Sequence, residues 1–100
     1  MKLQIFTIFD SKTQAYLPPS FLQNEEVALR SIRDVLKDPN HQFTKNPEDY
    51  SLWQIGLFDD EKGKITATPA PVHIASCHEL IEVTDQQFEA ATEFGALIGK

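Results

Sequence analysis

Three residues that could bind a metal lie close together late in the chain. His73, Cys77 and His78 fall within six residues of one another, and imidazole and thiolate groups are common zinc ligands. A tetrahedral structural site needs a fourth ligand and usually two well-spaced ligand pairs, but the sequence has no Cys-x-x-Cys pair. The pattern therefore favours a buried cysteine and two histidines at the surface, and we expect neither a metal site nor a cofactor.

Catalysis is not predicted from Cys77 or from the acidic cluster Asp59–Glu61. A cysteine nucleophile needs a general base, and the spacing singles out neither His41 nor His73. The acidic cluster lacks the Asp-x-Asp-x-Asp-Gly spacing of a calcium-binding loop, which favours a solvated hairpin turn. The sequence also has no glycine-rich phosphate loop, Walker lysine or hydrolase nucleophile elbow. We therefore expect a protein that is not an enzyme.

The residues best suited to binding a partner are cationic and lie on one predicted helix. Arg30, Arg33 and Lys37 are three and four residues apart, so a helix places them in one row. Such a row can contact DNA phosphates or an acidic protein surface, although an ordinary solvated helix face has the same pattern. Arg30, Arg33 and Lys37 are our candidate nucleic-acid or partner-binding residues.

Aromatic side chains are a second kind of candidate, because they can stack on the bases of single-stranded nucleic acid. Those considered are Tyr16, Phe21, Phe43, Tyr50 and Trp53. Burial in a small core is the commoner role of an aromatic residue, and we expect it for Trp53.

The elements that must position these residues are organised around a predicted hairpin over residues 50–65. Residues 52–58 carry apolar side chains on both faces at period two, which is typical of a central strand. The acidic cluster and Gly63 form the turn, because glycine readily takes the positive φ that such a loop needs. A returning strand follows, and we expect Pro69 and Pro71 to end its pairing.

A further strand and two helices complete the predicted elements. Residues 3–9 are apolar on both faces and are expected to pair with the strand over 52–58. An N-cap asparagine and an apolar stripe at helical spacing predict a helix over 24–37, with a start at Ser20 as the alternative. A capping threonine and a similar stripe predict a second helix over 85–97.

The remaining segments are predicted as connections. Residues 15–22 contain two prolines and are expected to be extended. Residues 41–49 form a polar loop in which Phe43 is expected to fold inward. Ser76 and Glu79 have the spacing of a capping box, which predicts a short helical turn.

Composition and element order give the fold class. A chain of 100 residues suffices for one domain, and residues 1–100 are predicted to form an α+β fold in which an antiparallel sheet of about three strands packs with two main helices. Nine Lys and Arg against fifteen Asp and Glu give a net charge of −6, which opposes non-specific attraction to nucleic acid or membranes. No run approaches the roughly 18 apolar residues of a membrane span.

Several segments of the sequence resemble one phage family. In chain order they are Pro18-Pro-Ser-Phe21, Lys37-Asp-Pro-Asn40, Asn46-Pro-Glu-Asp-Tyr50 and Ile55-Gly-Leu-Phe-Asp-Asp60. Together they resemble the small non-structural protein of gokushoviruses, which are single-stranded DNA phages of the Microviridae. The resemblance extends over roughly residues 3–81.

The resemblance implies a viral protein that is absent from the virion and is made in the host cytoplasm. The family is described as DNA-binding and is compared with a coliphage protein that switches replication to single-strand synthesis and packaging. We therefore expect a non-enzymatic regulator or adaptor in the synthesis or packaging of a single-stranded DNA genome. Its partner would be single-stranded DNA, bound weakly because the protein is acidic, or a phage or host replication or packaging protein.

A self-associating, scaffold-like protein is the alternative hypothesis. Apolar sheet edges could pair two copies of such a domain into a symmetric homodimer. Binding that weakens with salt would favour the DNA hypothesis, whereas a doubled mass in solution would favour self-association.

Overall fold

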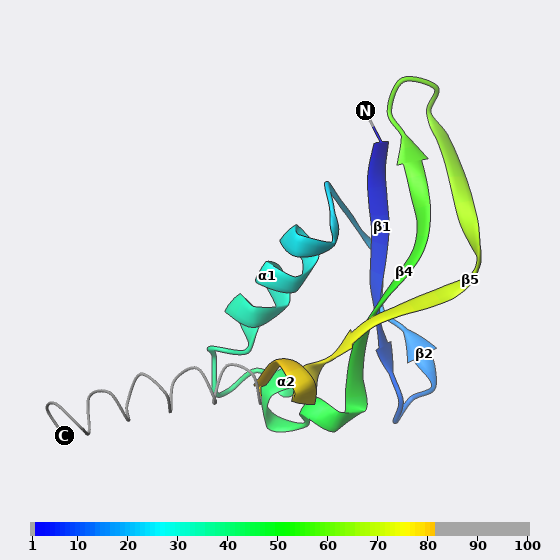
Figure 1. The fold of residues 1–100 in the computed structure, drawn as a ribbon. Helices are drawn as coiled ribbons and strands as arrows, with labels where there is room; N and C mark the ends of the chain where they lie inside the picture. The colour runs from blue at the N-terminus through cyan, green and yellow to red at the C-terminus, as the bar shows by residue number, and fades with distance from the viewer. Residues whose placement is uncertain (1, 82–100) are drawn as a thin grey trace, which may run out of the picture.

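A computed structural model describes residues 2–81 of the protein. The elements are β1 (Lys2–Asp10), β2 (Ala15–Tyr16), β3 (Ser20–Leu22), α1 (Glu25–Val35), α2 (Gln42–Lys45), the 3-10 turn η1 (Pro47–Asp49), β4 (Tyr50–Asp59) and β5 (Lys64–Ser76). Residues 77–81 are helical and follow β5 directly. Figure 1 shows α1 beside the long strands and α2 near their lower end. The helix predicted over 85–97 lies outside the described residues.

The strands form one antiparallel sheet in the order β2-β1-β4-β5, with β3 pairing on the same edge of β1 as β2. The α+β class, the antiparallel sheet and the central position of β4 are confirmed. Thr7 of β1 lies opposite Trp53 of β4, so the predicted pairing of these strands is also confirmed.

The expected number of about three strands is too low. The segment over 15–22, predicted as an extended connection, supplies both β2 and β3. Each is very short, so neither has a pattern that a sequence window can detect. They form because β1 offers an edge of unpaired backbone groups, and the amide of Leu17 between them donates to the Ile8 carbonyl at 2.8 Å.

The expectation that Pro69 and Pro71 end the pairing of the returning strand is confirmed only locally: pairing with β4 stops after Ala67 but resumes at Val72, and β5 continues to Ser76. The register between β4 and β5 shifts between Gln54 and Gly56, and the prolines fall opposite this shift. Among the described strands β5 pairs with β4 alone, so it is an edge strand there. Proline is tolerated at edges and bulges because its missing N–H removes no ladder hydrogen bond.

The helix predicted over 24–37 is confirmed as α1. The Asn24 side chain caps it, since its Oδ1 accepts a hydrogen bond from the Val27 amide at 2.9 Å. The alternative start at Ser20 is excluded, because Ser20 belongs to β3.

The core lies between α1 and one face of the sheet. Phe6 and Ile8 of β1 and Leu52 of β4 are buried on this face. Ala28 and Ile32, four residues apart on α1, are buried against them. This face of the sheet is therefore closed by the helix.

The predicted polar loop over 41–49 is more ordered than expected, because it contains α2 and η1. Phe43 folds inward as predicted and is buried beside Tyr50, with ring centroids 4.6 Å apart. The His41 side chain accepts a hydrogen bond from the Phe43 amide at 3.1 Å and so begins the short helix.

Gly56 lies where β4 and β5 approach too closely to leave room for a side chain. A Cβ there would lie 2.7 Å from the Thr66 carbonyl oxygen and 3.3 Å from Ile5 Cδ1. We expect Gly56→Ala to lower the free energy of unfolding, measured by urea titration, by about 1–3 kcal/mol because the backbone must move.

Gly63→Asn is the matched control for this change. Gly63 has a φ of +62°, which asparagine tolerates, and a Cβ there would meet nothing within 4 Å. If the Gly56→Ala protein were as stable as the wild type, the close approach of β4 and β5 at this point would be contradicted.

Candidate functional site

The sheet has a second face, opposite α1, that we call the open face (Figure 1). Residues paired across antiparallel strands lie on the same face of a sheet. Thr7, Trp53 and His73 are paired in this way and alternate with the buried residues that face α1. The register of β1, β4 and β5 therefore sets which side chains the open face presents.

Four rings form a continuous line across the open face. The centroids of Phe9 and Tyr16 are 4.8 Å apart, those of Tyr16 and Trp53 are 6.5 Å apart, and those of Trp53 and His73 are 5.0 Å apart. All three distances fall within the range of favourable ring contacts. We call Phe9, Tyr16, Trp53 and His73 the aromatic row; it takes one residue from each of β1, β2, β4 and β5.

The aromatic row is accessible from solvent. Tyr16 is 47% exposed and His73 is exposed, whereas Phe9 and Trp53 are half-buried. The expected burial of Trp53 is therefore only partial. The rings are inclined to one another by 50°, 86° and 74°, so a flat ligand could stack on an exposed ring such as Tyr16 but not on the whole row at once.

Two nitrogen atoms of the row, on Trp53 and His73, are hydrogen-bonded within the sheet. Trp53 Nε1 donates to Ser51 Oγ at 2.7 Å. His73 Nε2 lies 3.2 Å from Ser76 Oγ. Ser76 also directly precedes the helical residues 77–81, where a short helical turn was predicted. These contacts restrict the orientation of the Trp53 and His73 rings.

The structure separates the five aromatic residues that the sequence offered for stacking. Phe43 and Tyr50 are core residues. Phe21 is 42% exposed, and its ring centroid lies 5.6 Å from that of Phe58. These two rings are not part of the aromatic row. Tyr16 and Trp53 belong to the row, where Phe9 and His73 join them. Phe9 and His73 were not predicted from the sequence as stacking residues, and the signal for Phe9 was its period-two phase, which it shares with Leu3 and Ile5.

The open face carries no charged side chain among the paired residues of the described strands. By register these residues are Leu3, Ile5, Thr7, Phe9, Tyr16, Phe21, Ser51, Trp53, Gly56, Phe58, Ile65, Ala67, His73 and Ser76. A ligand on this face would therefore be held by stacking and apolar contact, with little help from ion pairs.

The cationic candidates lie elsewhere. Arg30, Arg33 and Lys37 are all exposed on or just after α1, and Lys37 Nζ lies 3.4 Å from Asp34 Oδ1. Because α1 packs on the other face of the sheet, the structure does not bring these residues to the aromatic row.

The residues considered for zinc point to different environments. Cys77 is buried at 1% exposure, whereas His73 and His78 are exposed. Burial raises the pKa of Cys77 to about 11, so its thiol is neutral at pH 7. A nucleophile or metal ligand needs the thiolate instead. Across residues 2–81, no three His, Cys, Asp or Glu side chains gather as a metal site would require.

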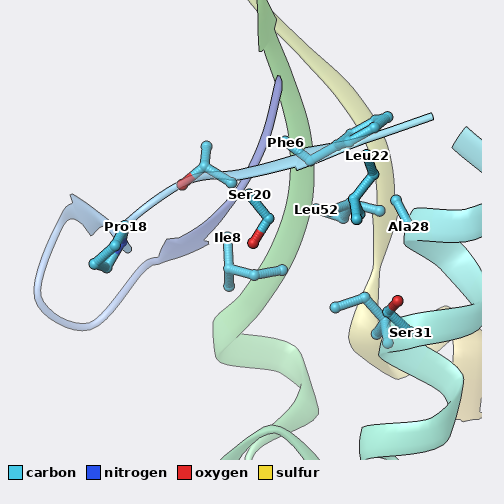
Figure 2. Close-up of a pocket in the computed structure, with 10 residues that line it drawn as sticks. Phe6, Ile8, Pro18, Ser20, Leu22, Ala28, Ser31 and Leu52 are labelled. Carbon is cyan, nitrogen blue, oxygen red and sulfur yellow. The ribbon is translucent and has the colours of Figure 1, made fainter. Parts of the chain in front are cut away.

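A small hollow opens between α1 and β3 (Figure 2). Its volume is about 100 Å³, and its lining includes the core residues Phe6, Ile8 and Leu52. Ligand pockets are usually several times larger. We therefore interpret this hollow as a gap in core packing.

Because Cys77 is buried, the fold is expected to lose stability at alkaline pH. Its pKa is raised from 9.0 to about 11, so the buried neutral thiol contributes fully below pH 9 and its contribution is lost as pH rises through 11. We expect the free energy of unfolding, measured by urea titration, to fall between these values. Burial also raises the pKa of Tyr50, which adds to the fall in the same direction.

The Cys77→Ala variant separates the contribution of Cys77 to this fall in stability from that of Tyr50. It lacks the thiol, so its free energy of unfolding should fall less steeply across this pH range than that of the wild type. An identical pH dependence in variant and wild type would contradict the burial of the thiol.

Comparison with known proteins gives the family. Residues 3–80 match the family model of the Phage ORF5 protein. Protein ORF5 of Chlamydia phage 1 is 33% identical over 76 residues, which cover 72% of this chain and 79% of that protein. No solved structure matches. In the described part of the chain, no helix has the length and apolar character needed to span a membrane.

The matched residues extend from β1 to the helical residues after β5 and include the whole aromatic row. They also agree with the Microviridae resemblance seen in the sequence. The chain belongs to the Phage ORF5 protein family.

Proposed function

We propose that this phage protein is a non-enzymatic binding protein that acts in the synthesis or packaging of a single-stranded DNA genome. In this proposal it contacts single-stranded DNA through the aromatic row. One observation carries the proposal: four rings, each in contact with the next, lie on a sheet face that no described helix covers. The family resemblance, which implies DNA binding, supports the same choice of ligand.

The chemistry of the row suits unpaired bases. Every base has a flat π-face, and stacking on an aromatic side chain contributes about 1–3 kcal/mol per base. Sheet surfaces that carry aromatic residues use this contact to bind single strands without reading a duplex. Tyr16 is the most exposed hydrophobic side chain of the row and Trp53 lies at its centre, so these two would provide the main stacking surfaces.

The charge distribution sets the expected strength of binding. The chain has a net charge of −6, and the open face has no cation among its paired residues. Each phosphate contact contributes about −0.7 to the slope of log affinity against log salt for a single strand. Binding by stacking should therefore be weak and should have a slope shallower than about −1.

The cationic residues of α1 are the competing DNA contact. Arg30, Arg33 and Lys37 together would give a slope of about −2 if each bound one phosphate. The same residues could meet an acidic surface on a replication or packaging protein. Either contact would use the side of the molecule opposite the aromatic row.

Self-association is a second candidate function, because two exposed apolar residues lie on the open face away from the row. Ile65 is 60% exposed and Phe21 is 42% exposed. Apolar surface of this kind can join two copies of a chain through a symmetric contact. Light scattering at micromolar concentration would show a doubled mass if this function holds.

The test is fluorescence anisotropy of a labelled single-stranded oligonucleotide over a salt series. Tyr16→Ala should weaken binding at least about fivefold, because it removes a stacking surface. Phe21→Ala is the matched control, since it removes an exposed aromatic ring from the same face but outside the row. Its affinity should stay within twofold of the wild type.

Two results would contradict the proposal. One is a steep salt slope that the Arg30→Ala/Arg33→Ala variant abolishes while Tyr16→Ala has no effect, which would place the DNA contact on α1. The other is no binding at low salt, which would leave a protein partner as the ligand.

A further inference from the structure

A second and larger hollow lies beside the turn that joins β4 to β5. Its volume is about 250 Å³, and it is lined by Lys2, Leu57, Asp59, Lys62, Lys64 and Thr66. Three of the nine Lys and Arg residues of the chain therefore border one site on an acidic protein. By register the hollow lies on the opposite face from the aromatic row, beyond the part of the sheet that α1 covers.

The one carboxylate of the lining is held by the turn. In the sheet register Asp59 is paired with Lys2 on one side and Lys64 on the other. Opposite charges paired across strands ordinarily attract each other. However, Asp59 Oδ1 accepts hydrogen bonds from the backbone amides of Glu61 at 3.0 Å and Lys62 at 3.2 Å. The carboxylate is thereby directed to the backbone of the turn.

None of the three lysines forms an ion pair with another described residue, so three positive charges border the hollow against the one negative charge of Asp59. Ion pairs between described residues join Lys12 to Asp49 and Lys37 to Asp34, and neither involves the hollow. An ammonium group has three N–H donors and no acceptor, so a cluster of lysines favours an oxyanion. The neighbouring acids Asp60 and Glu61 belong to the turn and are not part of the lining.

The rest of the lining fits a nucleotide better than a bare anion. The Thr66 side chain offers a hydroxyl that can donate to a phosphate oxygen. Leu57 is 37% exposed and gives the hollow an apolar wall against which a sugar or base can pack. Charge, donors and apolar surface are thus present together at one end of the sheet.

We infer that this hollow binds the phosphate of a nucleotide unit, with Lys2, Lys62 and Lys64 supplying the charge. The ligand is single-stranded DNA if the proposed function holds. The inference rests on the proposed function only for the identity of this ligand, and not for the phosphate site itself. In that case a phosphate of the DNA is bound at the β4–β5 turn. The aromatic row contributes no phosphate contact, and the cations of α1 are not needed for one.

The test is a titration followed by the backbone amide signals of ¹⁵N-labelled full-length protein. The three probes are inorganic phosphate, a deoxynucleoside monophosphate and a short single-stranded oligothymidylate. We expect saturable shifts at residues 59–66 and at Lys2 with each probe. The Lys62→Gln/Lys64→Gln variant should lower the affinity at least about fivefold, because two of the three cations are lost.

Lys12→Gln/Lys45→Gln is the matched control, because it changes the net charge by the same amount at two described residues that do not line the hollow. Its affinity for each probe should equal that of the wild type. Equal weakening in both double variants would show a general charge effect and overturn the inference. Absence of shifts at residues 59–66 with any probe would also overturn it.

The probes distinguish failure of this inference from failure of the proposed function. Phosphate and mononucleotide binding in the hollow without oligonucleotide binding anywhere would support a site for free nucleotides and refute the proposed DNA function. Oligonucleotide shifts confined to the aromatic row, with no response of the hollow to phosphate, would refute the inference and leave the proposed function standing.

Discussion

The pairing of β1 with β4 is the constraint on which the rest of the structure depends. With Ile8 opposite Leu52 and Thr7 opposite Trp53, one set of side chains faces α1 and the other faces away from it. A slip of one residue would exchange the two sets, because side chains alternate at period two. The same register therefore creates both the core and the open face. The Tyr16–Trp53 contact, which joins the two halves of the aromatic row across this strand pair, would be lost in such a slip.

The distribution of charge follows from this two-faced sheet. One face is closed by α1, whose outer side carries exposed cations and acids together. The open face is uncharged among its paired residues, although about a quarter of the chain is charged. An antiparallel sheet with one free face usually shows polar residues there. Although Ile5 and Thr7 are buried on this face, it exposes the aromatic residues Tyr16 and Phe21, and exposed apolar surface of this kind indicates a surface that binds something.

Much of the fold could be predicted because it depends on local patterns. The Asn24 cap and the apolar stripe predicted α1. Apolar residues on both faces of each strand predicted the β1–β4 pair. The inward position of Phe43 followed from an isolated aromatic residue in a polar loop. The exposure of Arg30 and Arg33 agrees with helical spacing, whereas their role in binding stays a prediction.

The features that sequence reasoning missed depend on long-range pairing. Strands β2 and β3 form only because β1 supplies hydrogen-bond partners, and the prolines of β5 are tolerated only because the register shifts beside them. The aromatic row brings together Phe9, Tyr16, Trp53 and His73 from four strands. No spacing in the sequence links these positions. The lysines of the turn were missed for the same reason, since Lys2 joins them only through pairing with Asp59.

Stacking of bases on the aromatic row can be followed directly through Trp53. It is the one tryptophan in the chain, so the intrinsic tryptophan fluorescence comes from the row alone. The decisive measurement is tryptophan emission during titration with an unlabelled single-stranded oligonucleotide. Stacking predicts saturable quenching whose midpoint matches that of binding measured by anisotropy. Binding by anisotropy with no change in Trp53 emission would contradict the claim.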